Sequence, residues 1–221
     1  MDPQQVLFAV ISAALVIVIS FPIHEFSHAF AAYRLGDSTA RWQGRLTLDP
    51  RAHFDLIGAA ALMISSILGS GIGWAKPTPV NPYNLRYGRR GEALVAMSGP
   101  LSNLIMAAVL AIPIRLISTN AGLEGTLISS PIAAAIWNVA FGFFVINCAL
   151  FVFNLVPIFP LDGWKVLLGL VDARTSYTLR QYEQYGMLLL FVLIVVGAPI
   201  LVPLIRAVVA FLAPEAGFYR L

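Results

Sequence analysis

Charged residues are scarce in this sequence. Only 11% of its 221 residues are charged and 59% are hydrophobic, whereas about a quarter of the residues of a soluble domain are charged. This composition excludes a disordered chain and a soluble nucleic-acid-binding domain, even though the net charge is +3. We interpret the basic residues as topology signals and lipid headgroup contacts, so we expect a lipid bilayer and no nucleic acid among the partners.

Cysteine is nearly absent, and internal repeats and a signal-peptide pattern are lacking. The single cysteine, Cys148, lies in a hydrophobic run and excludes a secreted disulfide scaffold. The N-terminal MDPQQ has no basic residue, and no small-residue cleavage pattern follows, so we expect a retained first helix. Because the connections between apolar runs are short, we expect residues 1–221 to form a single integral membrane domain.

The sequence contains long runs without any charged residue. There are five, and together they cover more than half of the chain. They span residues 3–24, 56–75, 93–114, 125–161 and 184–205. A helix needs about 20 apolar residues to cross about 30 Å of hydrocarbon. The runs therefore predict an all-α polytopic membrane protein, built as a helical bundle.

Proline and glycine set the expected helix boundaries. Pro3 is typical of a first helical turn, and Gly36 is typical of the residue that follows a helix. Pro157 and Pro160 should stop a helix before them. The expected helices are 3–35, 91–118, 132–155, a short one at 163–171 and 181–212, the last kinked or split by Gly197, Pro199 and Pro203.

The apolar run 56–75 can be interpreted in two ways. Its length allows a true crossing. However, basic residues cluster in the three connections 34–51, 76–90 and 165–180, and short basic loops favour the cytoplasm. All three connections can lie on that side only if the run is re-entrant or interfacial, followed by an extended Pro-rich segment. The charge bias favours re-entrance.

The first candidate site is the motif HEFSH near the end of the first helix. His24 and His28 are four residues apart, so they share one helix face, where two imidazoles can hold Zn²⁺. Glu25 lies about 100° around the helix axis, where it can reach a metal-bound water without being a ligand. This pattern fits a metallohydrolase.

The alternative for HEFSH is an interfacial histidine pair beside a carboxylate that reaches for water. The distance along the helix weighs against it. Gln4 to His24 is about 30 Å of helix, and His28 to Arg34 is about another 9 Å. The cluster therefore lies within the bilayer, about one and a half turns below the surface, where ionisable residues usually serve a function.

A catalytic zinc usually has three protein ligands, so a third donor is needed. Asp162 directly follows a spanning run, and the predicted path out along 91–118 and back along 132–155 returns it to the side of His28. The alternative role for Asp162 is an N-cap of the short helix at 163–171. His53 is the other candidate ligand, although DPRAHFD suggests a surface loop.

Four segments occur in an order typical of one family. They are HEFSH at 24–28, GWAKPTPVNPYNLR at 73–86, GPLSN at 99–103 and N-x-x-P-x-x-x-L-D-G at 154–163. In these motifs the chain resembles the site-2 proteases, which are intramembrane zinc metalloproteases. The resemblance implies that His24, His28 and Asp162 bind one Zn²⁺, that Glu25 is the general base and that Asn154 assists the substrate or the transition state.

The same resemblance implies that the Pro-rich stretch 74–85 is a membrane-associated extended region that pairs with a substrate strand. We interpret GPLSN as a helix-packing motif in which Asn103 makes a buried hydrogen bond. In the predicted helix 132–155, Asn138 and Asn147 are expected to make hydrogen bonds between helices.

The sequence therefore predicts an intramembrane zinc metalloendopeptidase that cleaves transmembrane segments of membrane proteins, in regulated intramembrane proteolysis. We expect a multi-pass protein of a prokaryotic cell (inner) membrane, with its active site toward the cytoplasmic side. The alternative is a membrane metal-ion transporter or sensor that uses the His and Asp residues as a transit site. A transporter would more naturally show paired half-helices or an internal repeat.

Overall fold

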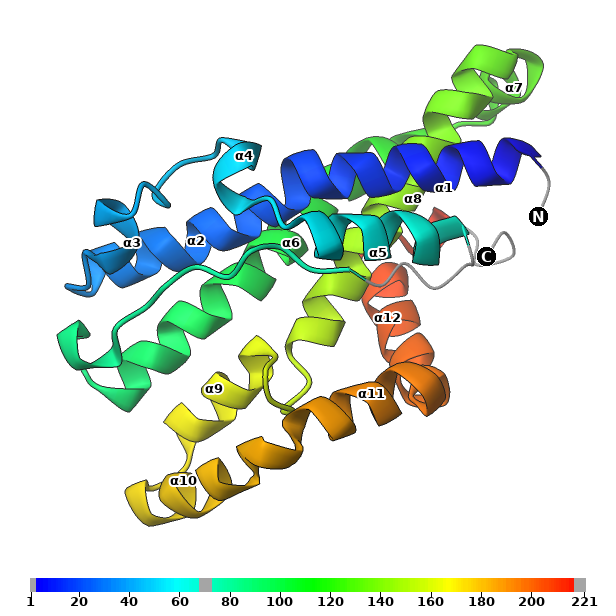
Figure 1. Ribbon diagram of the computed structural model, residues 1–221. Coiled ribbons are helices and arrows are strands. Elements are labelled where there is room, and N and C mark those ends of the chain that lie inside the picture. Colours follow the sequence, from blue (N-terminus) through cyan, green and yellow to red (C-terminus); the bar gives the residue numbers. More distant parts are fainter. Residues whose placement is uncertain (1–2, 68–72, 217–221) are drawn as a thin grey trace.

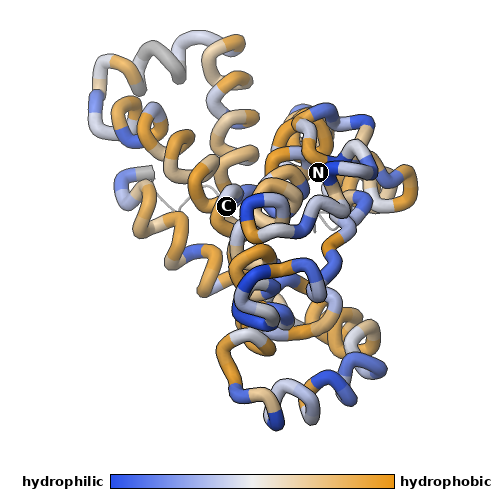
Figure 2. Tube along the Cα trace, turned by 90° about the vertical axis from the view of Figure 1, so that its left-hand side faces the viewer, coloured by the Kyte–Doolittle hydropathy of each residue, from blue (hydrophilic) through white to orange (hydrophobic). Residues whose placement is uncertain are grey.

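The computed structural model describes residues 3–67 and 73–216 (Figure 1), and within these ranges every regular element is helical. Four helical stretches are long and apolar enough to cross a membrane: Pro3–Arg34, Arg89–Ser118, Pro131–Asn154 and Ala173–Val196. Figure 2 shows hydrophobic residues along the long helices and hydrophilic residues mainly at their ends and in the connections. The predicted all-α polytopic membrane protein is confirmed.

The first membrane helix contains a π-helical turn that the sequence analysis did not predict. It consists of α1 (Pro3–Leu15), the π-turn η1 (Val16–Ser20) and α2 (Phe21–Arg34) in direct succession. Gly36 follows with φ of +110°, and a Cβ atom there would lie 3.0 Å from the Asn84 carbonyl oxygen. The expected helix over 3–35, ended by a glycine, is therefore confirmed.

The apolar run after the first helix does not cross the bundle. In the part of the chain that the structure describes, its helix, α5 (Leu56–Ile67), has 12 residues, or about 18 Å. The backbone N–H of Lys76 donates to the His53 carbonyl at 2.9 Å. The chain thus enters and leaves this region at the same place, as the charge bias favours, and an extended segment from residue 73 to 81 then runs back beside α2 (Figure 1).

Arg45 holds the two ends of this re-entrant region together. Its buried guanidinium donates to the carbonyl oxygens of Ala52, Lys76 and Pro77, which come from the chain before and after the region. Arg45 lies in the connection between two short helices, α3 (Thr39–Trp42) and α4 (Pro50–His53). A buried cation that satisfies three backbone acceptors therefore fixes the return of the chain.

The core of the bundle lies between two long helices, α6 (Arg89–Ser118) and α8 (Pro131–Asn154), and α12 (Ala198–Leu212). Small residues let the helices approach each other closely, as is usual in membranes. The buried cluster consists of Ala107, Ala111, Ile114, Phe144, Cys148, Val209 and Ala213. The expected helices 91–118 and 132–155 are confirmed to within two residues at each end.

The connection between α6 and α8 contains a further helix, α7 (Ala121–Ser129), which the sequence analysis did not predict. The Asn120 side chain caps this helix, because its Oδ1 accepts from the backbone N–H groups of Gly122 and Leu123 at 3.0 and 3.2 Å. An Asn cap of this kind is readable from sequence, so this was a missed signal.

The C-terminal part forms a limb that returns to the bundle. It comprises α9 (Asp162–Leu170), α10 (Ala173–Arg180), the 3-10 turn η3 (Gln181–Tyr185), α11 (Gly186–Val196), α12 and the 3-10 turn η4 (Pro214–Ala216). A break separates α11 from α12 at Gly197, so the predicted interruption of 181–212 is confirmed.

The three basic connections lie toward the same end of the molecule, opposite α7 (Figure 1). The N–H of Arg86, just after the 3-10 turn η2 (Pro82–Asn84), donates to the Leu35 carbonyl at 2.8 Å. Arg180 pairs with Glu92 at 3.2 Å. All three connections therefore lie on one side, as the topology prediction requires.

Candidate metal centre

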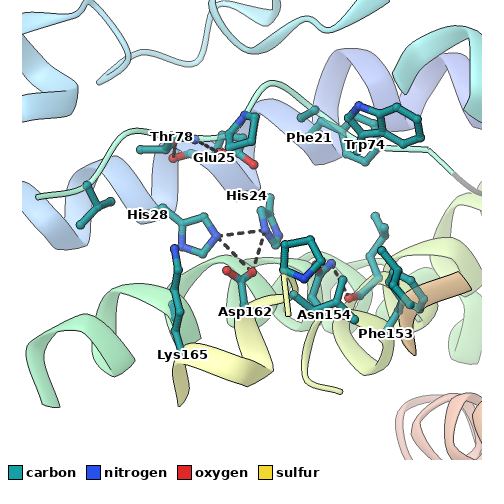
Figure 3. Close-up of a pocket in the computed structure, with 18 of the residues that line it drawn as sticks. Phe21, His24, Glu25, His28, Trp74, Thr78, Phe153, Asn154, Asp162 and Lys165 are labelled. Carbon is teal, nitrogen blue, oxygen red and sulfur yellow. Dashed lines mark hydrogen bonds and ion pairs between the residues drawn. The ribbon is translucent and has the colours of Figure 1, made fainter. Parts of the chain in front are cut away.

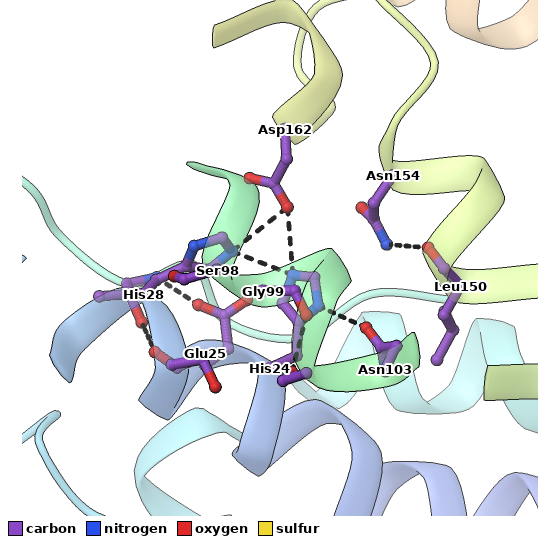
Figure 4. Close-up of polar contacts among 12 residues, drawn as sticks. His24, Glu25, His28, Ser98, Gly99, Asn103, Leu150, Asn154 and Asp162 are labelled. Carbon is purple, nitrogen blue, oxygen red and sulfur yellow. Dashed lines mark hydrogen bonds and ion pairs between the residues drawn. The ribbon is translucent and has the colours of Figure 1, made fainter. Parts of the chain in front are cut away.

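Two histidines and one aspartate converge in the interior of the bundle (Figure 4). His24 and His28 come from α2, and Asp162 is the first residue of α9. The two Nε2 atoms are 3.0 Å apart, and Asp162 Oδ2 lies 3.2 Å from each of them. The structure thus brings together the three residues that the sequence analysis predicted as ligands, in a geometry that can hold a metal ion.

Asp162 does not cap its helix. Leu161 occupies the N-cap position of α9, and the Asp162 carboxylate faces the histidines. The loop before it folds back so tightly that a Cβ on Gly163 would lie 2.2 Å from the Leu155 carbonyl oxygen. The capping alternative for Asp162 is therefore wrong, and Gly163 is needed for the turn that delivers the carboxylate.

His53, the other candidate ligand, lies away from the cluster. It is buried, with 1% of its surface exposed, and its Nε2 is 2.8 Å from the Thr47 carbonyl oxygen, to which it donates. The expectation that His53 sits in a surface loop is wrong, because α4 packs against α2 and η1 of the first helix. Its hydrogen bond supports the loop and does not contribute to the metal centre.

The hydrogen bonds made by the Nδ1 atoms of His24 and His28 decide which ring nitrogen carries the proton. His28 Nδ1 is 2.7 Å from the Val95 carbonyl oxygen, which can only accept, so Nδ1 carries a proton, and in the neutral ring Nε2 has a free lone pair. His24 Nδ1 is 2.7 Å from Asn103 Oδ1, which likewise accepts.

Two lone pairs and a carboxylate oxygen thus point at one place within 3.2 Å of each other. All three ligand atoms are rich in electrons, so they repel one another unless a cation lies between them. Nitrogen and oxygen donors of this type, each histidine held by a second hydrogen bond, are typical of zinc sites. The residues present therefore fit the zinc ion predicted from the sequence.

Gly99 lies directly against the histidine rings. A Cβ at this position would lie 2.3 Å from His28 Nε2 and 2.7 Å from His24 Cε1. Together with Asn103, four residues later on the same face of α6, Gly99 forms the wall behind the site. The sequence analysis assigned GPLSN to helix packing and missed this role, which the i, i+4 spacing of the glycine and the asparagine could have indicated.

Glu25 is turned toward the extended segment and away from the ligand positions. Its side chain is buried, and its Oε2 accepts a hydrogen bond from the Thr78 backbone N–H at 2.7 Å. The Thr78 hydroxyl donates to the Glu25 carbonyl oxygen at 3.0 Å. Glu25 therefore lies beside the metal centre without belonging to its ligand set, and Thr78 is a partner that sequence reasoning did not find.

A cavity of about 550 Å³ opens on this site (Figure 3). The extended segment, through Trp74 and Thr78, and α11, through Phe191, both line it. Asn154 also lines the cavity, but its Nδ2 donates to the Leu150 carbonyl of its own helix at 2.9 Å. The structure thus places Asn154 on the same cavity as the ligands, with its amide hydrogen-bonded to its own helix.

Asp37 fastens the end of the extended segment to the end of α2. Its carboxylate accepts from the Asn81 backbone N–H at 2.7 Å, the Thr39 hydroxyl at 2.6 Å and the Asn84 amide at 3.0 Å. Burial raises the pKa of Asp37, but the hydrogen bonds from Thr39, Asn84 and Asn81 outweigh it and leave the pKa below its ordinary value. Both ends of the segment beside Glu25 are therefore anchored.

A buried two-histidine, one-aspartate centre next to a glutamate, inside a bundle of helices long enough to span a membrane, fits a membrane metalloprotease as the class of protein. The model of peptidase family M50 matches residues 86–197. The chain belongs to this family, and the resemblance to the site-2 proteases is confirmed.

Two curated relatives agree with this assignment. "Putative zinc metalloprotease YwhC" of Bacillus subtilis is 35% identical over 195 residues, which cover 87% of this chain and 85% of that protein. "Putative zinc metalloprotease Rip2" of Mycobacterium tuberculosis is 34% identical over 178 residues, which cover 80% of this chain and 63% of that protein. No solved structure matches the chain.

Proposed function

We propose that this chain is an intramembrane zinc metalloendopeptidase that cleaves transmembrane segments of membrane proteins in regulated intramembrane proteolysis. It holds one zinc ion per chain on His24, His28 and Asp162, with Glu25 as the general base. The observation that carries the proposal is the convergence of three metal-ligand atoms beside a glutamate that is not a ligand, at the end of a membrane-spanning helix.

The chemistry divides between the metal and the chain. When bound, zinc supplies a Lewis acid that makes a water more acidic and polarises a peptide carbonyl. Glu25 accepts the proton of the attacking water and delivers it to the leaving amine. The hydrogen bond from the Thr78 N–H to Glu25 Oε2 holds one carboxylate oxygen, so the other oxygen is available for this transfer.

The cavity supports a substrate that is apolar and extended. The side chains that line the cavity are mainly apolar. Peptide bonds within a helix are shielded by their own hydrogen bonds, so the substrate segment must unwind before cleavage. The extended segment from 73 to 81 offers a backbone along which an unwound strand can lie. Asn154, at the edge of the cavity, assists the bound substrate.

The site lies nearer to the end of the molecule that carries the basic connections, which we place in the cytoplasm of a prokaryotic cell. Cysteines introduced at Gly44, Gly88 and Thr175 of a Cys148→Ser chain test this orientation. All three should react with a membrane-impermeant reagent from the cytoplasmic side. Reaction of all three from outside only would reverse the orientation.

The proposed chemistry is tested by comparing the native chain with Glu25→Gln, using zinc analysis and cleavage of a model transmembrane substrate. The Gln variant should keep its zinc and lose cleavage, because Glu25 is the base and not a ligand. His24→Ala should lose zinc and activity together. A folded Glu25→Gln chain without zinc would contradict the assignment, and one that cleaves normally would remove Glu25 from the mechanism. The transporter alternative is not favoured, because the chain belongs to a peptidase family.

A further inference from the structure

A chain of buried polar side chains leads from the metal centre across three membrane helices. Ser20 ends the π-turn of the first helix, Asn103 lies on α6 and Asn147 lies on α8, and all three are fully buried. Asn103 Nδ2 donates to Asn147 Oδ1 at 3.1 Å, and the Ser20 hydroxyl donates to the same oxygen at 3.0 Å. The other end of the chain is His24, whose Nδ1 is 2.7 Å from Asn103 Oδ1.

The direction of every bond in this chain follows from one backbone carbonyl. Asn147 Nδ2 is 2.9 Å from the Phe143 carbonyl oxygen, which can only accept. The amide nitrogen of Asn147 must therefore face Phe143, and its oxygen must face Asn103. Asn103 then turns its nitrogen toward Asn147 and its oxygen toward His24, which has to donate from Nδ1.

We propose that Ser20, Asn147 and Asn103 form a positioning network that fixes the ring orientation and the tautomer of His24, and thereby sets the zinc affinity of the site. This inference rests on the proposed zinc site. In the neutral ring with Nδ1 protonated, the Nε2 lone pair faces Asp162 and His28 before any metal binds. The π-turn places Ser20 one helical turn before His24, on the same face, where it reaches α8.

The two histidines differ in what holds them. His28 donates to the backbone carbonyl of Val95, which no substitution removes. His24 is held by the side chain of Asn103. A substitution of Asn103 can therefore change the orientation of the His24 ring. A polar network that only joined the helices would stabilise the bundle without changing metal binding, so zinc affinity separates the two roles.

The first experiment measures zinc affinity of the full chain in detergent by competition with a chromophoric chelator. Native chain, Asn103→Leu, Asn147→Leu and Asn138→Leu are compared. Asn138 is a matched control, because it lies on the same helix as Asn147 but is exposed, so the expectation that it bonds to another helix is not met. Replacing a residue that orients a metal-bound histidine typically weakens metal binding about 10–100-fold.

We expect Asn103→Leu to weaken zinc binding by about 10–100-fold, Asn147→Leu to weaken it less, and Asn138→Leu to bind zinc as the native chain does. Asn103→Leu with native affinity would overturn the inference. If Asp162→Ala also binds zinc as tightly as the native chain, the proposed zinc site itself fails, which is a distinct outcome.

A second measurement uses the native chain, so its result does not depend on whether the Leu variants fold. The ¹⁵N resonances of histidine-labelled native chain show which ring nitrogen of His24 carries the proton, with and without zinc. We expect the proton on Nδ1 in both states, because the network sets it in the absence of metal. A proton on Nε2 without zinc would overturn the inference.

Discussion

Gly99→Ala gives a direct test of the geometry of the metal centre. The added Cβ would lie 2.3 Å from His28 Nε2, 2.5 Å from His28 Cε1 and 2.7 Å from His24 Cε1. Ordinary contact begins at 3.4 Å, so the His28 ring must move by about 1 Å. Metal-ligand distances tolerate only about ±0.2 Å. The variant should therefore lose zinc binding, and cleavage should fall by about 100-fold or more.

The substitution should not unfold the helix. Alanine is better than glycine in a helix interior by about 0.5–1 kcal/mol, so any loss of function should arise at the histidines. Zinc content after dialysis against a mild chelator, with helical content measured by circular dichroism, separates the two effects. Gly125→Ala is the control, because Gly125 is also helical and a Cβ there meets nothing within 4 Å. Native zinc content in a folded Gly99→Ala chain would refute the reasoning.

Three further predictions test the other parts of the site. Asp162→Asn should fold normally, since Asp162 caps nothing, but lose zinc to mild chelation and be inactive; elemental analysis would contradict the ligand role if zinc stayed at the native level. Thr78→Pro removes the N–H that holds Glu25 and should lower kcat about 10–100-fold with zinc retained, whereas Thr78→Val keeps the N–H and should have near-native kcat. Because the pKa of Asp37 is lowered by folding, its stabilisation is present above the unfolded pKa of about 3.9 and lost as the pH falls through the folded value. Asp37→Asn should therefore lower Tm at pH 7 and have little effect near pH 2, and equal Tm losses at both would exclude this role.

Local patterns were sufficient for the membrane helices and for part of the site. Charge-free runs locate the four stretches that are long and apolar enough to cross a membrane, because a bilayer of about 30 Å requires about 20 apolar residues. The run 56–75 is equally long, so length alone did not decide its path. The pair His24 and His28 follows from helix periodicity, since residues four apart share a face. These features depend on neighbours in the sequence, so the tertiary structure was not needed to find them.

Features that depend on distant segments needed the structure. The choice between crossing and re-entrance was decided by the hydrogen bond between His53 and Lys76, and Asp162 was shown to face the histidines only once α9 packed against α6. The spacing of Gly99 and Asn103 could only suggest a shared helix face, and Thr78 carries no signal of its own, because both roles arise from the distance to side chains of α2. Sequence periodicity determines which face of a helix a residue occupies, but the packing of helices decides what that face meets.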